Sequence, residues 1–384
     1  MNEHPCHAAN TDSCDNERCL FPAYLRRFPV TTRPVIIGHR GASGYRPEHT
    51  LASYELAARL GADFLEPDLV STADGVLVAR HENEIGGSTD IASRPEFTDR
   101  RTTKVVDGWE VTGWFTEDLT LTELRTLRAQ ERIPHLRPHN TSHDGQHGVP
   151  TMLEIIDLAD QLTTELGRPV GVYPETKHPS YFASLGLPLE PPLLDVLAST
   201  GRDRPDANVF VQSFETGNLR WLAERLPVPL VQLLAPVGAP YDLVAAGDAQ
   251  SYADLASPEG LAEIATYASA IGPDKTMVIG WDGDDRLGAP TSLVTDAHRA
   301  GLAVHPYTFR VENVFLPVDY RRSGELAEHG GPGGGPGKHG ELAELGELAE
   351  HGDLAGELAA YFALGVDGVF TDHPDIAVAA RARR

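Results

Sequence analysis

The sequence has few cysteines, and they do not form the disulfide framework of a small secreted protein. Cys6, Cys14 and Cys19 are the only three in 384 residues, and all of them precede the first apolar run. An odd number of cysteines with uneven spacing does not match such a framework. A zinc site that combines them with His4 or His7 is the alternative that this segment leaves open.

Long apolar runs and an excess of basic residues are also missing. No run approaches the length of a membrane span, and the N-terminus has no basic segment followed by an apolar one, so the sequence as written predicts a cytoplasmic protein. Lysine and arginine number 32 against 56 aspartates and glutamates, which gives a net charge of -24. This charge repels nucleic acid and anionic membranes, so we expect neither as a partner. A small anionic substrate is compatible with it if the site supplies local positive charge or a metal ion.

Apolar runs alternate with helical patterns along most of the chain. Predicted strands span 35–41, 62–70, 75–81, 170–177, 208–214, 229–234, 277–281, 302–309 and 365–372. Predicted helices span 53–62, 151–166, 192–200, 218–226, 259–270, 292–301 and 358–365. About eight strand-then-helix units predict an α/β fold with a parallel sheet, and we favour a TIM (β/α)8 barrel. A doubly wound sheet would alternate in the same way, but no glycine-rich dinucleotide loop follows the first strand.

Three segments lie outside this alternation. Residues 1–33 form a polar arm before the predicted barrel, which spans 34–379. Residues 83–150 have weak periodicity and many polar, glycine and proline residues, so they predict a cap subdomain inserted over the barrel mouth. Within 323–356 the unit GELAE recurs around a stretch rich in glycine and proline, which predicts a low-complexity insertion outside the core.

Four histidines recur every four residues in the inserted segment, at His135, His139, His143 and His147. On a helix they would share one face and could hold a metal ion. Pro138 interrupts any helix there, so the pattern favours a solvated loop.

Polar residues capable of chemistry follow several of the predicted strands. Barrels build their sites in this way, because the C-terminal ends of all strands face one mouth. In chain order these residues are His39, Arg40, Glu66, Asp68, His81, Glu175, Lys177 and Gln212.

Two of the carboxylates lie two positions apart on one strand, so Glu66 and Asp68 point to the same face. At about 4 Å their repulsion is on the order of 4 kcal/mol at an effective dielectric of about 20, unless a cation lies between them. A hydrated surface pair would need no cation, but the apolar neighbours of these two residues favour a metal site. Glu175 is the natural third ligand, and carboxylates without cysteine favour one Mg²⁺ or Ca²⁺ ion over zinc.

His39 and His81 each end a predicted strand. Either one alone would more often be a structural histidine, but a pair can take up one proton and deliver another at neutral pH. Glu48 could orient one imidazole or join the metal ligands, whereas Arg40 and Lys177 suit phosphate oxygens. Together with a metal ion, this set of side chains suits phosphodiester cleavage.

Six separated motifs resemble the glycerophosphodiester phosphodiesterase family, and they look closest to its bacterial branch typified by the periplasmic enzyme. They are HRGASGYRPEHT, the E-x-D of Glu66 and Asp68, His81, YPETKHP, HPYTFR and GVDGVFTDHPD. The resemblance covers about residues 34–379 without the repeat. It implies a barrel of the phospholipase C-like phosphodiesterase kind and hydrolysis of glycerophosphodiesters to sn-glycerol 3-phosphate and an alcohol.

The resemblance also implies roles for individual residues. The family usually has aspartate after the second histidine, where this chain has Glu82, and we place Glu82 and Glu48 around the site in supporting positions. The matched positions are the acid–base pair His39 and His81, the metal ligands Glu66, Asp68 and Glu175, and the phosphate contacts Arg40 and Lys177.

In the predicted mechanism His39 is the base toward an attacking hydroxyl, for which the glycerol C2 hydroxyl of the substrate is one candidate. His81 is the acid toward the departing alcohol. Two other functions stay open: a cyclising, phospholipase D-like lyase that stops at the cyclic phosphate, and a non-catalytic barrel that binds phosphodiesters.

The substrate pocket is expected to include Gln212, Trp281 and Tyr307. An aromatic side chain there, or at Phe309, would make choline esters attractive substrates, with core packing as the alternative for each. The sequence does not distinguish Mg²⁺ from Ca²⁺, and it predicts neither the head group nor the oligomeric state.

Overall fold

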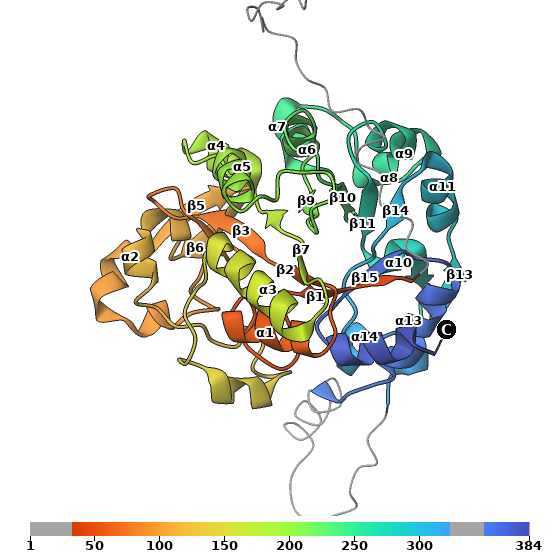
Figure 1. The fold of residues 1–384 in the computed structure, drawn as a ribbon, viewed down its shortest axis with the longest axis horizontal. Helices are drawn as coiled ribbons and strands as arrows, with labels where there is room; N and C mark the ends of the chain where they lie inside the picture. Colours follow the sequence, from red (N-terminus) through yellow and green to blue (C-terminus); the bar gives the residue numbers. More distant parts are fainter. Residues whose placement is uncertain (1–32, 323–348, 384) are drawn as a thin grey trace, which may run out of the picture.

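The computed structural model describes residues 33–322 and 349–383 (Figure 1). The three cysteines, the arm up to residue 32 and most of the GELAE repeat therefore lie outside the described residues. In the described part, no helix combines the length and the apolar character that a bilayer span requires.

Parallel strands form a closed barrel at the centre of the described chain. They pair in the orders β15-β1-β2-β7 and β14-β11-β10-β9-β8-β3, and a parallel bridge between Phe309 and Thr371 joins the two sheets. Pro67 separates β2 from β3 and Pro174 separates β7 from β8, so each of these pairs is one bent strand of the barrel. The predicted TIM barrel is confirmed. Its strands are β1 (Val35–His39), β2 (Phe64–Glu66), β3 (Asp68–Ser71), β7 (Gly171–Val172), β8 (Glu175–Thr176), β9 (Val211–Ser213), β10 (Leu230–Leu234), β11 (Ala270–Pro273), β14 (Ala303–Val304) and β15 (Gly368–Thr371).

Helices surround the barrel between successive strands (Figure 1). The first begins after Thr50, whose side chain accepts a hydrogen bond from the Ser53 N–H. The longest begins at a capping box of Thr151 and Glu154 and ends at Gly167 in the left-handed conformation. The surrounding helices are α1 (Leu51–Arg59), α3 (Met152–Leu166), α4 (Pro179–Ser184), α5 (Glu190–Ser199), α6 (Thr216–Ala223), α7 (Tyr241–Ala246), α8 (Tyr252–Leu255), α9 (Pro258–Ile264), α11 (Leu293–Ala300), α13 (Leu354–Ala363) and α14 (Pro374–Arg381).

Aromatic and β-branched side chains fill the barrel interior. The rings of Tyr173 and Phe210 stack with centroids 4.7 Å apart, and Phe64 meets both edge-on. Ile37, Val231 and Phe370, from strands around the barrel, belong to the same cluster. The interior is therefore a packed floor rather than a pore, so a site at the C-terminal ends of the strands is closed from below.

The inserted segment lies beside the barrel, next to β3 (Figure 1). After β4 (Leu77–Ala79), which pairs antiparallel with β3, it forms a two-stranded ribbon of β5 (Thr102–Val106) and β6 (Trp109–Gly113), followed by α2 (Leu121–Leu124). Its apolar side chains join the main core, Phe115 with 1% of its surface exposed. The four regularly spaced histidines begin in a loop and continue through a 3₁₀ turn at Pro138–His143. They form no metal cluster in the described chain.

The sequence analysis missed one barrel strand, β11, which begins at the last residue of a predicted helix. The helix expected over 259–270 ends as α9 at Ile264, and β11 follows between β10 and β14. The apolar pattern continues through the buried residues Tyr267 and Ala268, so the helical period gave no sign of this end. Ala270–Pro273 is also too short a run to stand out as a strand.

The strand predicted at 277–281 is found only over its last three residues, and it is not a barrel strand. Asp274 caps the short helix α10 (Lys275–Val278) by accepting a hydrogen bond from the Thr276 N–H. The chain then forms β12 (Ile279–Trp281), which pairs antiparallel with β13 (Leu287–Pro290) and lies outside the barrel. The apolar run is real, but it belongs to a surface ribbon.

The last part of the repeat also differs from expectation. We expected it outside the core, whereas α13 begins at Leu354, whose side chain is 1% exposed. Glu357 on the same helix is fully buried and its carboxylate lies 2.6 Å from the Lys275 ammonium. The end of the repeat, from Leu354 on, therefore belongs to a core helix of the barrel.

Candidate active site

The polar residues that follow the barrel strands meet in one cavity of about 320 Å³ at the mouth. Ten of the site residues predicted from the sequence line it. The other two, Glu48 and Glu82, contact lining residues from outside it. The fold thus brings together side chains from β1, β2, β3, β8 and β9, from the loops that follow barrel strands, and from a ribbon outside the barrel.

Three carboxylates form the acidic part of the cavity. Glu66 ends β2, Asp68 begins β3, and Glu175 begins the neighbouring β8, in register with Asp68. One oxygen from each lies within 4.8 Å of the others, and all three side chains are buried. This is the only group of potential metal ligands of its kind among the described residues.

The protonation of these carboxylates reflects their crowding. Burial, and then the charges of Asp68 and Glu175, hold the pKa of Glu66 well above its usual value. Burial also raises the pKa of Glu175 to about 8, although Lys177 opposes the shift. The pKa of Asp68 is instead well below its usual value, because the hydrogen bond with His49 and the charge of Lys177 outweigh burial. Such a set fits a divalent cation, which would relieve the repulsion.

Neighbouring groups fix each carboxylate. Gln212 donates its side-chain N–H to Glu66 Oε1 at 3.0 Å, and the Arg40 backbone N–H donates to Glu66 Oε2 at 2.8 Å. His49 Nε2 lies 2.9 Å from Asp68 Oδ2, and Lys177 Nζ lies 3.1 Å from Glu175 Oε1. Fixed ligands of this kind keep a metal site organised.

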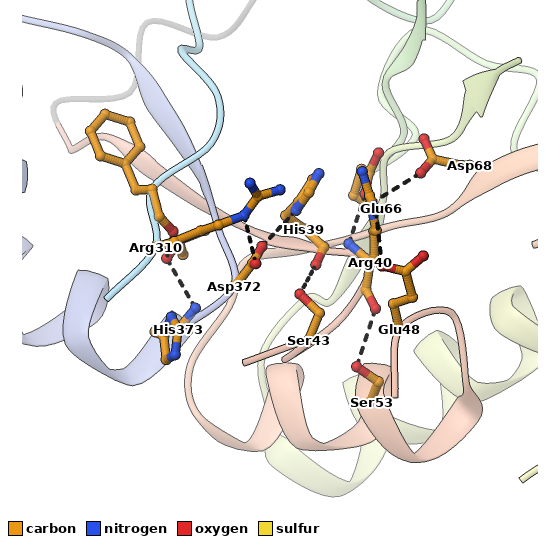
Figure 2. A network of polar contacts seen from close by, with 12 residues as sticks. His39, Arg40, Ser43, Glu48, Ser53, Glu66, Asp68, Arg310, Asp372 and His373 are labelled. Atoms are coloured by element: carbon orange, nitrogen blue, oxygen red, sulfur yellow. Dashed lines mark hydrogen bonds and ion pairs between the residues drawn. The ribbon is translucent and has the colours of Figure 1, made fainter. Parts of the chain in front are cut away.

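His39 ends β1 and is held by a carboxylate from the other end of the chain. Its Nδ1 lies 2.6 Å from Asp372 Oδ1 (Figure 2). This contact favours the tautomer with the proton on Nδ1 and leaves Nε2 as an acceptor. Burial, and then the charge of Arg40, lower the pKa of His39 to about 4 against the opposing effect of Asp372. His39 is therefore neutral at pH 7 and able to accept a proton.

Asp372 is the centre of a buried ion network. Its second oxygen, Oδ2, lies 2.6 Å from Arg137 Nη2 and 2.9 Å from Arg310 Nε. Arg137 comes from the inserted segment and also binds Glu312 at 2.5 Å. Figure 2 shows Asp372 between His39 and Arg310. The inserted segment thus reaches the support of His39 directly.

His81 lies in the loop after β4 and is more exposed than His39, with 25% of its side chain accessible. Its Nδ1 lies 2.8 Å from Glu82 Oε1, and the other carboxylate oxygen of Glu82, Oε2, lies 3.3 Å from His178. Burial, followed by the charges of Arg40 and Lys177, lowers the pKa of His81 to about 3. The glutamate that stands where the family usually has aspartate therefore does contact this imidazole.

Arg40 lies between Glu48 and the carboxylate triad. Its Nη1 donates to Glu48 Oε2 at 2.9 Å, and Arg132 Nε donates to the same oxygen at 3.0 Å. Glu48 thus positions Arg40 and belongs neither to the carboxylate triad nor to a contact with His39. The backbone of Arg40 is left-handed, with φ of 58°, a conformation that costs a non-glycine residue on the order of 1 kcal/mol.

Comparisons with known proteins agree with this geometry. The model of the Glycerophosphoryl diester phosphodiesterase family matches residues 39–376. A glycerophosphodiester phosphodiesterase of Arabidopsis thaliana is 34% identical over 304 residues, which cover 76% of this chain and 78% of that protein. One of Haemophilus influenzae is 32% identical over 299 residues, covering 72% and 79%. The chain belongs to the glycerophosphoryl diester phosphodiesterase family.

Solved structures share the fold at lower identity. A crystal structure from Silicibacter pomeroyi has a TM-score of 0.57 at 20% identity and covers 94% of this chain and 96% of that one. A phosphodiesterase of Oleispira antarctica, solved with the product sn-glycerol-3-phosphate, has a TM-score of 0.53 at 18% identity, with coverage of 91% and 96%. This membership confirms the predicted family and the prediction that the protein is a phosphoric diester hydrolase. Its assignment to the bacterial branch stays a prediction.

Aromatic residues form the outer wall of the site in this family member. Trp281, on β12, and Tyr307, after β14, both line the cavity, and the Tyr307 hydroxyl donates to the Leu234 carbonyl at 3.0 Å. Phe214 adjoins Tyr307 with ring centroids 6.0 Å apart. Phe309 does not line the cavity: it is fully buried against Tyr361 at 4.8 Å. For Phe309 the core-packing alternative is therefore correct.

Sequence analysis missed several residues of the site. Asp372 and Arg310 lie in motifs that carried the family resemblance, but no local pattern singled them out from their neighbours. Arg137 lies in the weakly patterned insertion, and Lys275, which also lines the cavity, lies two residues before the segment 277–281. His49 follows Glu48 in the HRGASGYRPEHT motif, and its contact with Asp68 could have been considered there.

Proposed function

We propose that the protein hydrolyses glycerophosphodiesters to sn-glycerol 3-phosphate and an alcohol, with a divalent cation and two-histidine acid–base catalysis. The observation that carries the proposal is that one cavity contains a buried carboxylate triad, two imidazoles and two cationic side chains. Cleavage of a phosphodiester requires charge neutralisation at phosphorus, a base and an acid, and these side chains together can provide all three.

Glu66, Asp68 and Glu175 would hold the cation, for which their all-oxygen donor set favours Ca²⁺ or Mg²⁺. When bound, the cation supplies Lewis-acid stabilisation of negative charge on the phosphate oxygens. The buried, mutually repelling carboxylates support this role, because their charges have too few cationic partners within the protein.

Arg40 and Lys177 provide the remaining positive charge. Both are buried at the cavity wall, at 5% and 8% exposure, so their interaction with a phosphate is little screened by water. A bound phosphodiester also opposes the effect of these two cations on the neighbouring imidazoles. Its negative charge therefore favours protonation of His81, which both cations disfavour in the free site.

His39 is assigned as the base and His81 as the acid. Neutral His39, oriented by Asp372, accepts the proton of the attacking hydroxyl as its oxygen bonds to phosphorus. Protonated His81 gives its proton to the alcohol oxygen as the bond from that oxygen to phosphorus breaks. The attacking hydroxyl is that of water or the C2 hydroxyl of the glycerol group; in the second case water opens the resulting cyclic phosphate.

A substrate panel with chelator treatment tests the proposal. We expect release of glycerol phosphate from several glycerophosphodiesters, loss of turnover in EDTA, and recovery on addition of Ca²⁺ or Mg²⁺. Phosphorus-31 NMR of the products separates free glycerol phosphate from a persisting cyclic ester, which would instead establish the lyase. Turnover that is unaffected by exhaustive chelation would contradict the metal-dependent mechanism.

A further inference from the structure

A second cavity of about 530 Å³ opens beside the first on the barrel rim. Glu175, Lys177 and Phe214 line both cavities, so the second directly adjoins the site where the phosphate would bind. Its walls come from the loops after β8, β9 and β10. Its outer edge is the turn of the β5–β6 ribbon, at 107–109.

The walls of this cavity are rich in aromatic rings. Phe214 and Tyr252 meet edge-on with centroids 6.1 Å apart. Across from them, the ribbon turn approaches Tyr241: a Cβ at Gly108 would lie 3.8 Å from the Cε2 atom of that ring. Trp109, next in the turn, is 77% exposed. An exposed tryptophan at the rim of a cavity offers an open ring face to a ligand, and tryptophan is the best side chain for binding a cation in this way.

Two carboxylates by this cavity have no cationic partner. Glu215 lines it and accepts a hydrogen bond from the Ser180 N–H at 3.2 Å, whereas Asp242, nearby, accepts from the Gly217 N–H at 2.6 Å. Within the described residues neither one forms an ion pair. Burial, and then the charges of Asp242 and Asp107, raise the pKa of Glu215 to about 7.

The cations that face the cavity are already paired. Lys177 Nζ lies 3.1 Å from Glu175, and His178 Nδ1 lies 2.6 Å from Asp107. The charge of Asp242, and that of Glu215 in its ionised form, therefore has no cationic partner at this end of the site, and a bound cation would favour the ionised form of Glu215. Aromatic faces together with uncompensated carboxylates are the features that bind alkylammonium groups.

The proposed proton donor lies on the side of the second cavity. Glu82 contacts His81 at 2.8 Å and His178 at 3.3 Å, and His178 lines the second cavity. His39 lies toward Asp372 and Arg310, on the side of β1 and β15. An alcohol that leaves toward His81 therefore departs toward the second cavity.

We propose that the second cavity binds the leaving alcohol, and that its aromatic and acidic walls favour alcohols with a positively charged amine, such as choline and ethanolamine. This inference rests on the proposed function, because it concerns the alcohol that the hydrolysis releases. It assigns Trp109 and Glu215 as specificity residues and the β5–β6 ribbon as the element that carries one of them.

A pair of isosteric substrates tests the charge preference. Glycerophosphocholine is compared with the 3,3-dimethylbutyl ester of glycerol phosphate, in which a carbon atom replaces the nitrogen. We expect kcat/KM to be about tenfold higher for the choline ester, in keeping with an interaction between a cation and aromatic and acidic groups. Equal values for two good substrates would overturn the inference and leave the proposed function intact. Failure to hydrolyse either ester would refute both.

Two substitutions locate the preference. Glu215→Gln removes the carboxylate charge, and Trp109→Leu removes the ring while keeping an apolar side chain at an exposed position. We expect each to lower kcat/KM for the choline ester about five- to tenfold and to change that of the neutral ester less than about twofold. The matched controls Glu224→Gln and Trp221→Leu, on or next to α6 and outside both cavities, should change neither value. Equal losses for both esters in the two test variants would contradict a cation site.

Discussion

At the scale of single residues, the two imidazoles have different supports. His39 is held by Asp372, whose side chain is 2% exposed and fixed by two arginines. His81 contacts Glu82, whose side chain is 49% exposed. A rigid, buried orienting group suits a base that must accept a proton at a defined atom, and an acid near solvent can regain its proton after each turnover.

Changing the leaving group should distinguish the two histidines. With a choline ester, we expect His39→Ala and His81→Ala each to lower kcat/KM by a factor of about 10² to 10⁴. The 4-nitrophenyl ester of glycerol phosphate has a leaving group that needs no proton. With this ester the kcat/KM of His81→Ala should return most of the way to the wild-type value, whereas that of His39→Ala should stay low. His139→Ala, at an exposed histidine of the insertion, is the control. The reverse pattern would exchange the two roles, and equal defects with both esters would remove His81 as the acid.

The sequence revealed the residues whose position at the end of a strand indicates a chemical role. It did not reveal the residues that hold them in place. Glu66, Asp68 and Glu175 could be predicted because carboxylates among apolar strand residues are unusual wherever they occur. Asp372 is 333 positions from His39, and Arg137 is 235 positions from Asp372. An ion pair over such a separation leaves no local periodicity, so only the folded barrel identifies these partners.

At the scale of elements, the β5–β6 ribbon is tied to the barrel by one histidine. His178 immediately precedes α4 and its Nδ1 lies 2.6 Å from Asp107 in the ribbon turn. Its Nε2 lies 3.3 Å from Glu82 in the loop after β4. Burial lowers the pKa of His178, but the two carboxylates outweigh it and raise the pKa to about 9. The protonated imidazole thus joins three segments of the rim.

This contact predicts a loss of stability at alkaline pH. Because the pKa of His178 is about 9 in the folded protein and about 6.5 when unfolded, its contribution is complete below pH 6.5 and is lost as the pH rises to 9. We expect it to reach ~1–2 kcal/mol after allowance for solvent screening. Urea unfolding from pH 6 to 10 measures it as the difference between the wild type and His178→Gln, with His139→Gln as control. A difference that stays constant over this range would contradict the prediction.

Element boundaries were predictable where capping residues mark them. Thr151 and Glu154 flank the start of α3, and Gly167 its end, and the predicted helix 151–166 agrees with the observed one. The error at β11 has the opposite cause. No glycine or proline separates Ile264 from Ala270, so the helical pattern runs on where the chain has turned into the barrel.

At the scale of the whole molecule, the site exists only when the barrel is closed. β1 and β15, from the two ends of the described chain, pair side by side and carry His39 and the segment that leads to Asp372. The carboxylate triad likewise combines β2, β3 and β8. A cation that binds these three carboxylates binds only the folded barrel, so it must stabilise the entire fold rather than one loop.

Ca²⁺ or Mg²⁺ should therefore raise the free energy of unfolding, by about 2.7 kcal/mol at a hundredfold excess over the Kd. Thermal unfolding in EDTA and after add-back of the metal measures this effect.

The variant Glu66→Gln makes the test specific to the triad. Burial and two neighbouring carboxylates favour the neutral form of Glu66, and an amide mimics that form. We expect this variant to be at least as stable as the wild type in EDTA and to gain nothing from the metal, whereas Glu224→Gln should respond like the wild type. If Glu66→Gln gained as much as the wild type, the stabilising cation would bind elsewhere, because a triad that has lost a charge and a ligand cannot bind it equally well.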